Sequence, residues 1–183
     1  MNWKSFLQNN LSPVLARWNE LALELYAAET IGFMKRQKDR FQNPVGHATT
    51  TALDELLRGL ADGKQPGEMD EALDRLARVR AVQDFPPSAA LRFVFLLKHV
   101  LREQAGADGL DDLDQFDATI DTLALAAFDR YVRCREQLYE LRADEFKRQM
   151  ASLLKRAERS SKSSEKSDGV TDVKGSSKGG CGA

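Results

Sequence analysis

The sequence predicts an all-α protein, a helical bundle with a long C-terminal helix and a disordered tail. Three observations predict it. Apolar residues recur every three or four positions along most of the chain, as on one face of a helix. Asn-Pro and Ser-Pro pairs stand where such stretches begin. No credible pair of strands is visible, since no two neighbouring stretches alternate with the period of two that a half-buried strand needs.

The first two predicted helices begin at a polar cap followed by proline. Ser12-Pro13 is an N-cap signal, and Val14 and Trp18 begin an apolar face behind it. Asn43-Pro44 begins the second apolar face, and Gly63 is its predicted stop. We therefore expect helices from about residue 13 and from about residue 44.

Proline also separates the next two helices. The third is expected from Pro66 to Phe85, because a residue that precedes proline is pushed out of the α region. The fourth, from Pro87 to Gln104, carries apolar residues on nearly every side, which is typical of a helix at the centre of a core.

The last predicted helix is the longest, because no Pro or Gly interrupts residues 110–159. Its apolar residues repeat in steps of three and four, the pattern of a coiled-coil seam, and Phe146, Met150 and Leu153 extend that pattern. We expect the seam to join two copies of the chain, and the alternative is that the helix folds back on its own core. The residues predicted for the dimer seam are Leu123, Ala127, Tyr131, Cys134, Leu138 and Leu141.

Composition sets the domain boundaries and excludes several classes of protein. We expect one domain over residues 1–159 and a disordered tail over 160–183, which holds seven Ser, five Gly and no aromatic residue. Lys and Arg (27) almost balance Asp and Glu (28), so the net charge of −1 argues against a nucleic-acid partner. No apolar run is long enough to insert in a membrane, and no signal core is seen, so we expect a cytoplasmic protein.

No residue type stands in a pattern that indicates catalysis, a metal or a cofactor. The chain lacks nucleotide-binding, hydrolase and zinc motifs, and its two histidines are His47 and His99. We therefore predict no enzyme. The alternative function is a redox- or ligand-responsive accessory protein that uses the thiol of Cys181 or an apolar helical pocket near His99. The acidic residues between Asp108 and Asp121 do not fit a calcium loop and suit the first turn of a helix.

Three stretches resemble a known family. The first is Leu15-Ala-Arg-Trp with the helix that follows it, and the second runs from Phe33 to Gly46 and contains KDRFQNPVG. The third begins at Val79, contains RAVQDFPPS from Arg80, and continues with FVFLLK from Phe93. They resemble the N-terminal domain of RsbRD-type proteins, the RsbT co-antagonists of the bacterial stressosome, and the similarity covers roughly residues 10–145. The residues that carry it are Lys38, Asp39, Arg40, Phe41, Asn43, Pro44, Gly46, Arg80, Gln83, Asp84 and Phe85.

The resemblance implies a sensory or regulatory input domain for a stress response. It implies an all-helical, globin-like fold without haem, which dimerises and is joined by a long helix to a C-terminal STAS domain. We expect that STAS domain to be missing here, because Ser, Gly and Lys dominate the sequence after the long helix. The predicted function is thus a non-enzymatic input domain in signal transduction that contacts a regulatory protein of unknown identity as a homodimer.

Overall fold

All regular secondary structure in the described part of the chain is helical. The computed structural model describes residues 1–26, 43–106 and 109–168, with side chains as far as Ser160. Its elements are α1 (Trp3–Asn9), α2 (Leu11–Leu23), α4 (Pro44–Ala61), the 3-10 helix η1 (Pro66–Met69), α5 (Asp70–Val82), α6 (Pro87–Ala105) and α7 (Leu113–Asp168). The chain divides into two units, Met1–Leu138 and Tyr139–Ala183, so α7 begins in the first unit and ends in the second. The predicted all-α class is confirmed.

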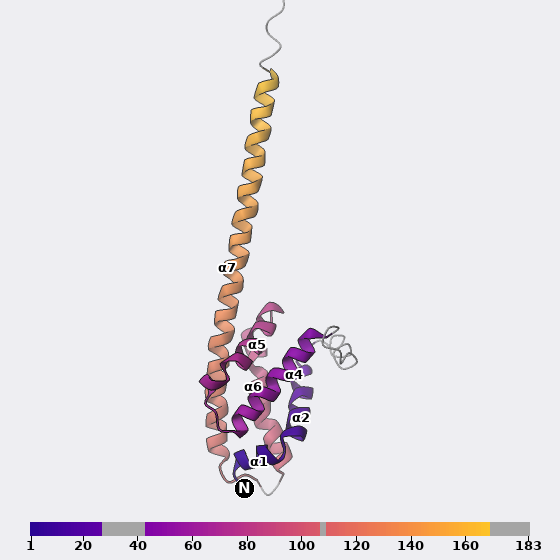
Figure 1. Ribbon diagram of the computed structural model, residues 1–183, viewed down its shortest axis with the longest axis vertical. Coiled ribbons are helices and arrows are strands. Elements are labelled where there is room, and N and C mark those ends of the chain that lie inside the picture. Colours follow the sequence, from indigo (N-terminus) through magenta and orange to yellow (C-terminus); the bar gives the residue numbers. More distant parts are fainter. Residues whose placement is uncertain (27–42, 107–108, 169–183) are drawn as a thin grey trace, which may run out of the picture. The chain divides into compact units, whose positions relative to one another are not determined.

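The first unit is a bundle with one main core. Helix α4 packs against α5 and α2, and α2 packs against α6, as Figure 1 shows. The start of α7 closes this core with Phe116, Ile120 and Leu123, which are fully buried. The bundle therefore consists of α1, α2, α4, α5, α6 and the first part of α7.

Local signals fix the ends of α4 as the sequence predicts. Asn43 is the N-cap, and its side-chain oxygen accepts a hydrogen bond from the backbone N–H of Gly46 at 2.8 Å. Pro44 occupies the first turn, where its missing N–H costs nothing. The helix ends at Ala61, and Gly63 follows with φ +76°, a left-handed conformation that favours glycine.

The start of α2 differs from the prediction. Its N-cap is Asn10, so Ser12 and Pro13 lie inside the first turn. A short helix, α1, precedes it and was not predicted. A seven-residue helix is unstable by itself, and α1 is held by the burial of Trp3, Phe6 and Leu7 in the core. That burial depends on residues far along the chain, which a local pattern cannot show.

The third predicted helix is split at Met69. Residues Pro66–Met69 form η1, and Gln65 and Glu68 exchange the two hydrogen bonds of a capping box there. Helix α6 starts at Pro87 as predicted, but it is not buried all round, since the side chain of Phe95 is 46% exposed. It ends before Gly106, which has φ +67°.

Helix α7 is longer than predicted. It continues to Asp168, so residues 160–168 are helical although the sequence predicted a tail from Ser160. Cys181 and the rest of the predicted tail, residues 169–183, lie outside the described residues. In the described part of the chain, no helix combines the length and the apolar character that crossing a membrane would require.

Candidate functional site

The predicted dimer seam lies largely in the core of its own chain. Leu123, Ala127, Tyr131 and Cys134 are each at most 4% exposed. Phe116, Leu123 and Ala127 belong to the main core, and Tyr131 and Cys134 pack with the alanines of α5 and α6. A side chain packed in its own bundle cannot also pack on a second chain. These four residues therefore offer no surface to a partner in this structure.

The other two seam residues have different surroundings. Leu138 is half-buried and packs against the cluster that holds Tyr131 and Cys134. Leu141, in the second unit, is 67% exposed. Of the predicted seam residues, only Leu141 is thus open to a partner, and it lies apart from Tyr139, Phe146, Met150 and Leu153, which are also exposed in the second unit.

Those side chains form one row along α7 in the second unit. Tyr139, Phe146, Met150 and Leu153 are between 43% and 63% exposed. With Ala143 and Ala157 they follow steps of four and three, so they share one face of the helix. We call this set the exposed row: Tyr139, Ala143, Phe146, Met150, Leu153 and Ala157.

The sequence contained a signal that separates the exposed row from the seam. The step from Leu141 to Phe146 is five residues, which at about 100° per residue turns the side chain by about 140°. Phe146 therefore does not continue the face of Leu141, although the predicted seam extends from one to the other. Charged residues such as Arg142, Asp144 and Glu145 occupy the other sides of the helix.

The turn between α5 and α6 is bonded to α7 within the first unit. Asp84 has φ +55°, a backbone conformation that residues other than glycine seldom adopt. Its carboxylate pairs with Arg135 at 2.9 Å, and the carbonyl oxygen of Phe85 accepts a hydrogen bond from the hydroxyl of Tyr131. Two family residues, Asp84 and Phe85, thus hold α7 within the first unit, whereas Gln83 is an exposed C-cap of α5.

Arg80 is buried at the inner side of the same turn. Its guanidinium carbon lies 5.1 Å from the ring centre of Tyr26, 5.0 Å from Phe85 and 5.5 Å from Phe93, and the side chain is 0% exposed. One long hydrogen bond, at 3.5 Å, reaches the carbonyl oxygen of Ala22. Desolvation lowers the pKa of Arg80 below its ordinary value. Among the described residues no carboxylate pairs with it, so aromatic faces provide its main stabilisation.

The remaining family residues have a structural role or lie outside the described part. Asn43 and Gly46 form the cap of α4, and a Cβ on Gly46 would lie 2.3 Å from the Asn43 amide nitrogen. Pro44 is in the first turn. Lys38, Asp39, Arg40 and Phe41 fall outside the described residues.

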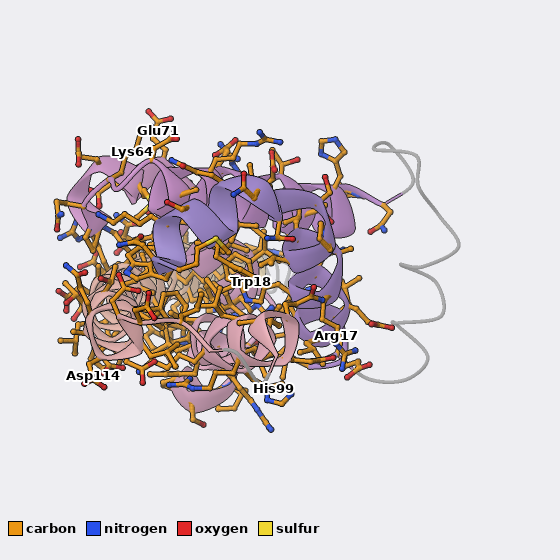
Figure 2. All side chains as sticks on the ribbon, turned by 90° about the horizontal axis from the view of Figure 1, so that it is seen from below. Arg17, Trp18, Lys64, Glu71, His99 and Asp114 are labelled. Carbon is orange, nitrogen blue, oxygen red and sulfur yellow. The ribbon has the colours of Figure 1, made fainter. Side chains whose placement is uncertain are left out.

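Both histidines are exposed on the described part of the chain. His99 is on the outside of α6, with its side chain 68% exposed and its Nε2 3.6 Å from Glu103 (Figure 2). The His99 ring is therefore largely open to solvent, and a ligand pocket near it stays a prediction. His47 is exposed near the start of α4. In the described ranges, no group of three His, Cys, Asp or Glu side chains is placed to hold a metal.

The acidic residues at the start of α7 are occupied in contacts within the first unit. Asp112 accepts hydrogen bonds from the backbone N–H of Trp3 and from the side chain of Asn2. Asp117 pairs with Arg102 at 2.6 Å, and Asp121 pairs with Lys98 at 2.6 Å. These carboxylates bond the start of α7 to α1 and α6. They also stand at the N-terminal end of α7, where the sequence predicted that negative charge suits the helix dipole.

The comparisons with known proteins give one match. Residues 14–146 match the family described as the RsbT co-antagonist protein RsbRD N-terminal domain. No curated protein and no solved structure matches the chain. The match covers all of the first unit except α1 and the start of α2, together with the first residues of the second unit. The globin-like arrangement stays a prediction.

Proposed function

The chain belongs to the family of RsbT co-antagonist protein RsbRD N-terminal domains, which are regulatory domains of stress signalling. From that premise we propose that it is a non-enzymatic, cytoplasmic input domain that acts as a homodimer and relays its signal to a regulatory protein. The observation that supports the proposal is the exposed row on the part of α7 that belongs to the second unit.

The exposed row is the surface that a second copy fits. Phe146, Met150 and Leu153 are large apolar side chains on a helix whose other sides are mostly charged. Burying one such side chain stabilises a protein by about 1.5–3 kcal/mol. A partner that covers the row would therefore be bound with a favourable free energy. A second copy presents the same row with the same spacing, and two such rows interlock as a coiled coil. A homodimer therefore buries the row without any other partner.

The described residues favour binding to another protein over catalysis as the mode of action. The thiol of Cys134 is buried, and desolvation together with the nearby carboxylate of Asp74 raises its pKa, so it is held as a poor nucleophile. His47 and His99 lie on different helices, and both are exposed. These observations support a role in which α7 carries the output and no bond is made or broken.

The experiment is a measurement of mass by light scattering after size-exclusion chromatography, at tens of micromolar. We expect a dimer for the wild type and a monomer for Phe146→Glu and for Met150→Glu, because a carboxylate in the row is desolvated and faces its own copy. Phe146 is 63% exposed, so these substitutions do not disturb the bundle of the first unit.

The matched control is Leu141→Glu. Leu141 is 67% exposed on the same helix but outside the row, so this variant should remain a dimer. A monomeric wild type would contradict the proposal. So would a dimer that Leu141→Glu abolishes and Phe146→Glu leaves intact, because the interface would then use the face of Leu141.

A further inference from the structure

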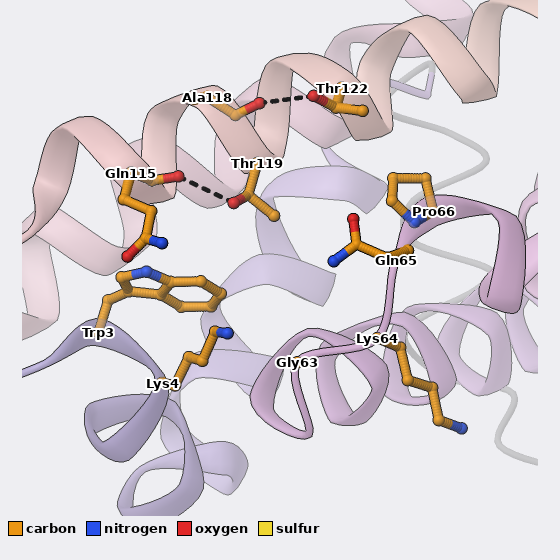
Figure 3. Close-up of a pocket in the computed structure, with 10 residues that line it drawn as sticks. All are labelled: Trp3, Lys4, Gly63, Lys64, Gln65, Pro66, Gln115, Ala118, Thr119 and Thr122. Atoms are coloured by element: carbon orange, nitrogen blue, oxygen red, sulfur yellow. Dashed lines mark hydrogen bonds between the residues drawn. The ribbon is translucent and has the colours of Figure 1, made fainter.

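A cavity of about 230 Å³ lies within the first unit, between α1, the segment that leads from α4 into η1, and the start of α7 (Figure 3). Its walls include the indole of Trp3 and the ring of Pro66, with Gln115 and Thr119 contributed by α7. No carboxylate lines it. The cavity is open to solvent at one side and large enough for a molecule of a few heavy atoms.

Lys4 supplies a positive charge to the lining of the cavity. Its ammonium group points into the space between Trp3 and Gln65 and lies 5.4 Å from the centre of the Trp3 ring (Figure 3). Gly63 makes room for it, because a Cβ at that position would lie 3.1 Å from the Lys4 Nζ. Among the described residues, no carboxylate lies within ion-pair distance of Lys4. The charge is therefore available to an anion.

The indole N–H of Trp3 is a second unused donor. Trp3 is 1% exposed, and its Nε1 has no hydrogen-bond partner in the described part of the chain. A buried donor without a partner costs about 1–3 kcal/mol. The other tryptophan shows the usual arrangement, since Trp18 donates to the carbonyl oxygen of Phe93 at 2.7 Å. The Trp3 nitrogen is on the edge of the ring that faces Gln115 (Figure 3), and it has almost no exposed surface, so the indole meets the cavity through its ring.

Two side-chain amides complete the polar lining. The oxygen of Gln65 accepts a backbone hydrogen bond in the capping box, which leaves its amide hydrogens for a ligand. Gln115 extends from α7 above the indole (Figure 3). The hydroxyls of Thr119 and Thr122 donate instead to backbone carbonyls one turn earlier, at 2.8 and 2.9 Å. The available groups are thus donors, with one cation among them.

We propose that this cavity binds a small organic monocarboxylate. One ammonium group matches one negative charge, and the amide N–H groups of Gln65 and Gln115 match the two oxygens of a carboxylate. The face of the indole and Pro66 suit a short hydrocarbon body. Phosphate carries more charge and has no apolar part, so it fits the cavity less well.

Binding would join α1 to α7 in the first unit. A ligand that contacts Lys4 and Gln115 adds a bridge between these helices, and α7 is the helix that carries the exposed row. The role of this ligand as the sensed signal rests on the proposed function, whereas its binding does not. A carboxylate metabolite would then stabilise one placement of α7 by its differential affinity.

The test uses the full chain and propionate as the probe. Calorimetric titration and the intrinsic tryptophan fluorescence should both give saturable binding, and propionate should raise the melting temperature as its concentration passes Kd. Propionamide has the same shape without the charge, and we expect its affinity to be at least tenfold lower. Inorganic phosphate at matched ionic strength should also bind at least tenfold more weakly. Equal or tighter binding of phosphate would overturn the carboxylate assignment.

Lys4→Met should raise the Kd for propionate at least tenfold, and Gln115→Leu at least threefold. The matched control is Lys64→Met, because Lys64 lines the same cavity with an ammonium group that points away from it (Figure 3). Its Kd should stay within twofold of wild type. Circular dichroism melts of the free variants confirm that each is folded.

Two results would overturn the proposal: no saturation of the wild type up to 100 mM propionate, or equal losses in Lys64→Met and Lys4→Met. The monomeric variant Phe146→Glu should bind propionate as the wild type does. Failure of the dimer and failure of the ligand site are therefore separate outcomes.

Discussion

Tyr131 of α7 donates a hydrogen bond to the backbone carbonyl oxygen of Phe85, at the turn between α5 and α6. The same turn is held by the ion pair of Asp84 with Arg135 at 2.9 Å. Phe85 also places its ring against the guanidinium of Arg80. One turn therefore connects a buried charge of the first unit to the part of α7 around Tyr131 and Arg135.

The hydrogen bond of Tyr131 gives the first prediction. Tyr131→Phe keeps the ring but leaves the Phe85 carbonyl oxygen without that donor, so the free energy of unfolding should fall by about 1–2 kcal/mol. Arg135→Gln, at the exposed ion pair, should cost less than about 1 kcal/mol. Urea denaturation followed by circular dichroism measures both. Equal losses in the two variants would contradict the assignment of the larger role to Tyr131.

The cap of α4 gives a second prediction with a control glycine. Gly46→Ala places a Cβ 2.3 Å from the side-chain amide nitrogen of Asn43, so the cap must move and its hydrogen bond is lost. We expect a loss of about 1–2 kcal/mol in the free energy of unfolding. Gly67→Ala meets no atom within 4 Å and should change it by less than about 0.5 kcal/mol. Thermal melts of both variants, fitted with the wild type, decide between these values.

Arg80 gives a third prediction, on the balance between desolvation and aromatic contact. Arg80→Met removes a buried charge and fills a similar volume, so stability should change by less than about 1 kcal/mol, whereas Arg80→Ala leaves a cavity and should lose about 2–4 kcal/mol. The comparison is made by denaturant unfolding. If Arg80→Met were as damaging as Arg80→Ala, then the charge itself, and not its volume, would hold the turn.

Cys134 gives a fourth prediction, on pH. Its pKa is raised in the folded protein by desolvation and by Asp74, so the folded state keeps the proton longer than the unfolded state does. As pH rises above the ordinary thiol pKa of about 8.5, the unfolded state loses its proton first, and stability should fall. In Cys134→Ala, the free energy of unfolding should fall less between pH 8 and pH 10 than it does in the wild type. Each protein is compared with its own value at pH 8, and urea denaturation gives these values.

The same group can be followed by its reactivity. In a Cys181→Ser background, Cys134 is the remaining thiol. At pH 8 its reaction with a disulfide reagent should be at least 100-fold slower in the native protein than in urea, because it is 4% exposed and protonated. Comparable rates in the two states would show that Cys134 is reached by solvent in the folded chain.

Local chemistry made part of the fold predictable. Asn43 with Pro44 marked the start of α4, Gly63 marked its end, and Pro87 marked the start of α6, because each acts on its own neighbouring backbone. Asn10 was missed as the N-cap of α2, since the Ser12-Pro13 pair presents an equally good local signal two residues later. Local preference could not choose between them.

The sequence by itself determined that the chain is helical, where most helices begin, and that the last helix is apolar along much of its length. Only the tertiary structure decided which side of that helix is already used, by burying Leu123 and Tyr131 in the bundle and leaving Phe146 in water. It also brought Lys4 and Gln115 to one cavity. Periodicity depends on neighbours along the chain, whereas burial and pocket formation depend on helices that are distant in sequence, and that is why the first could be predicted and the second could not.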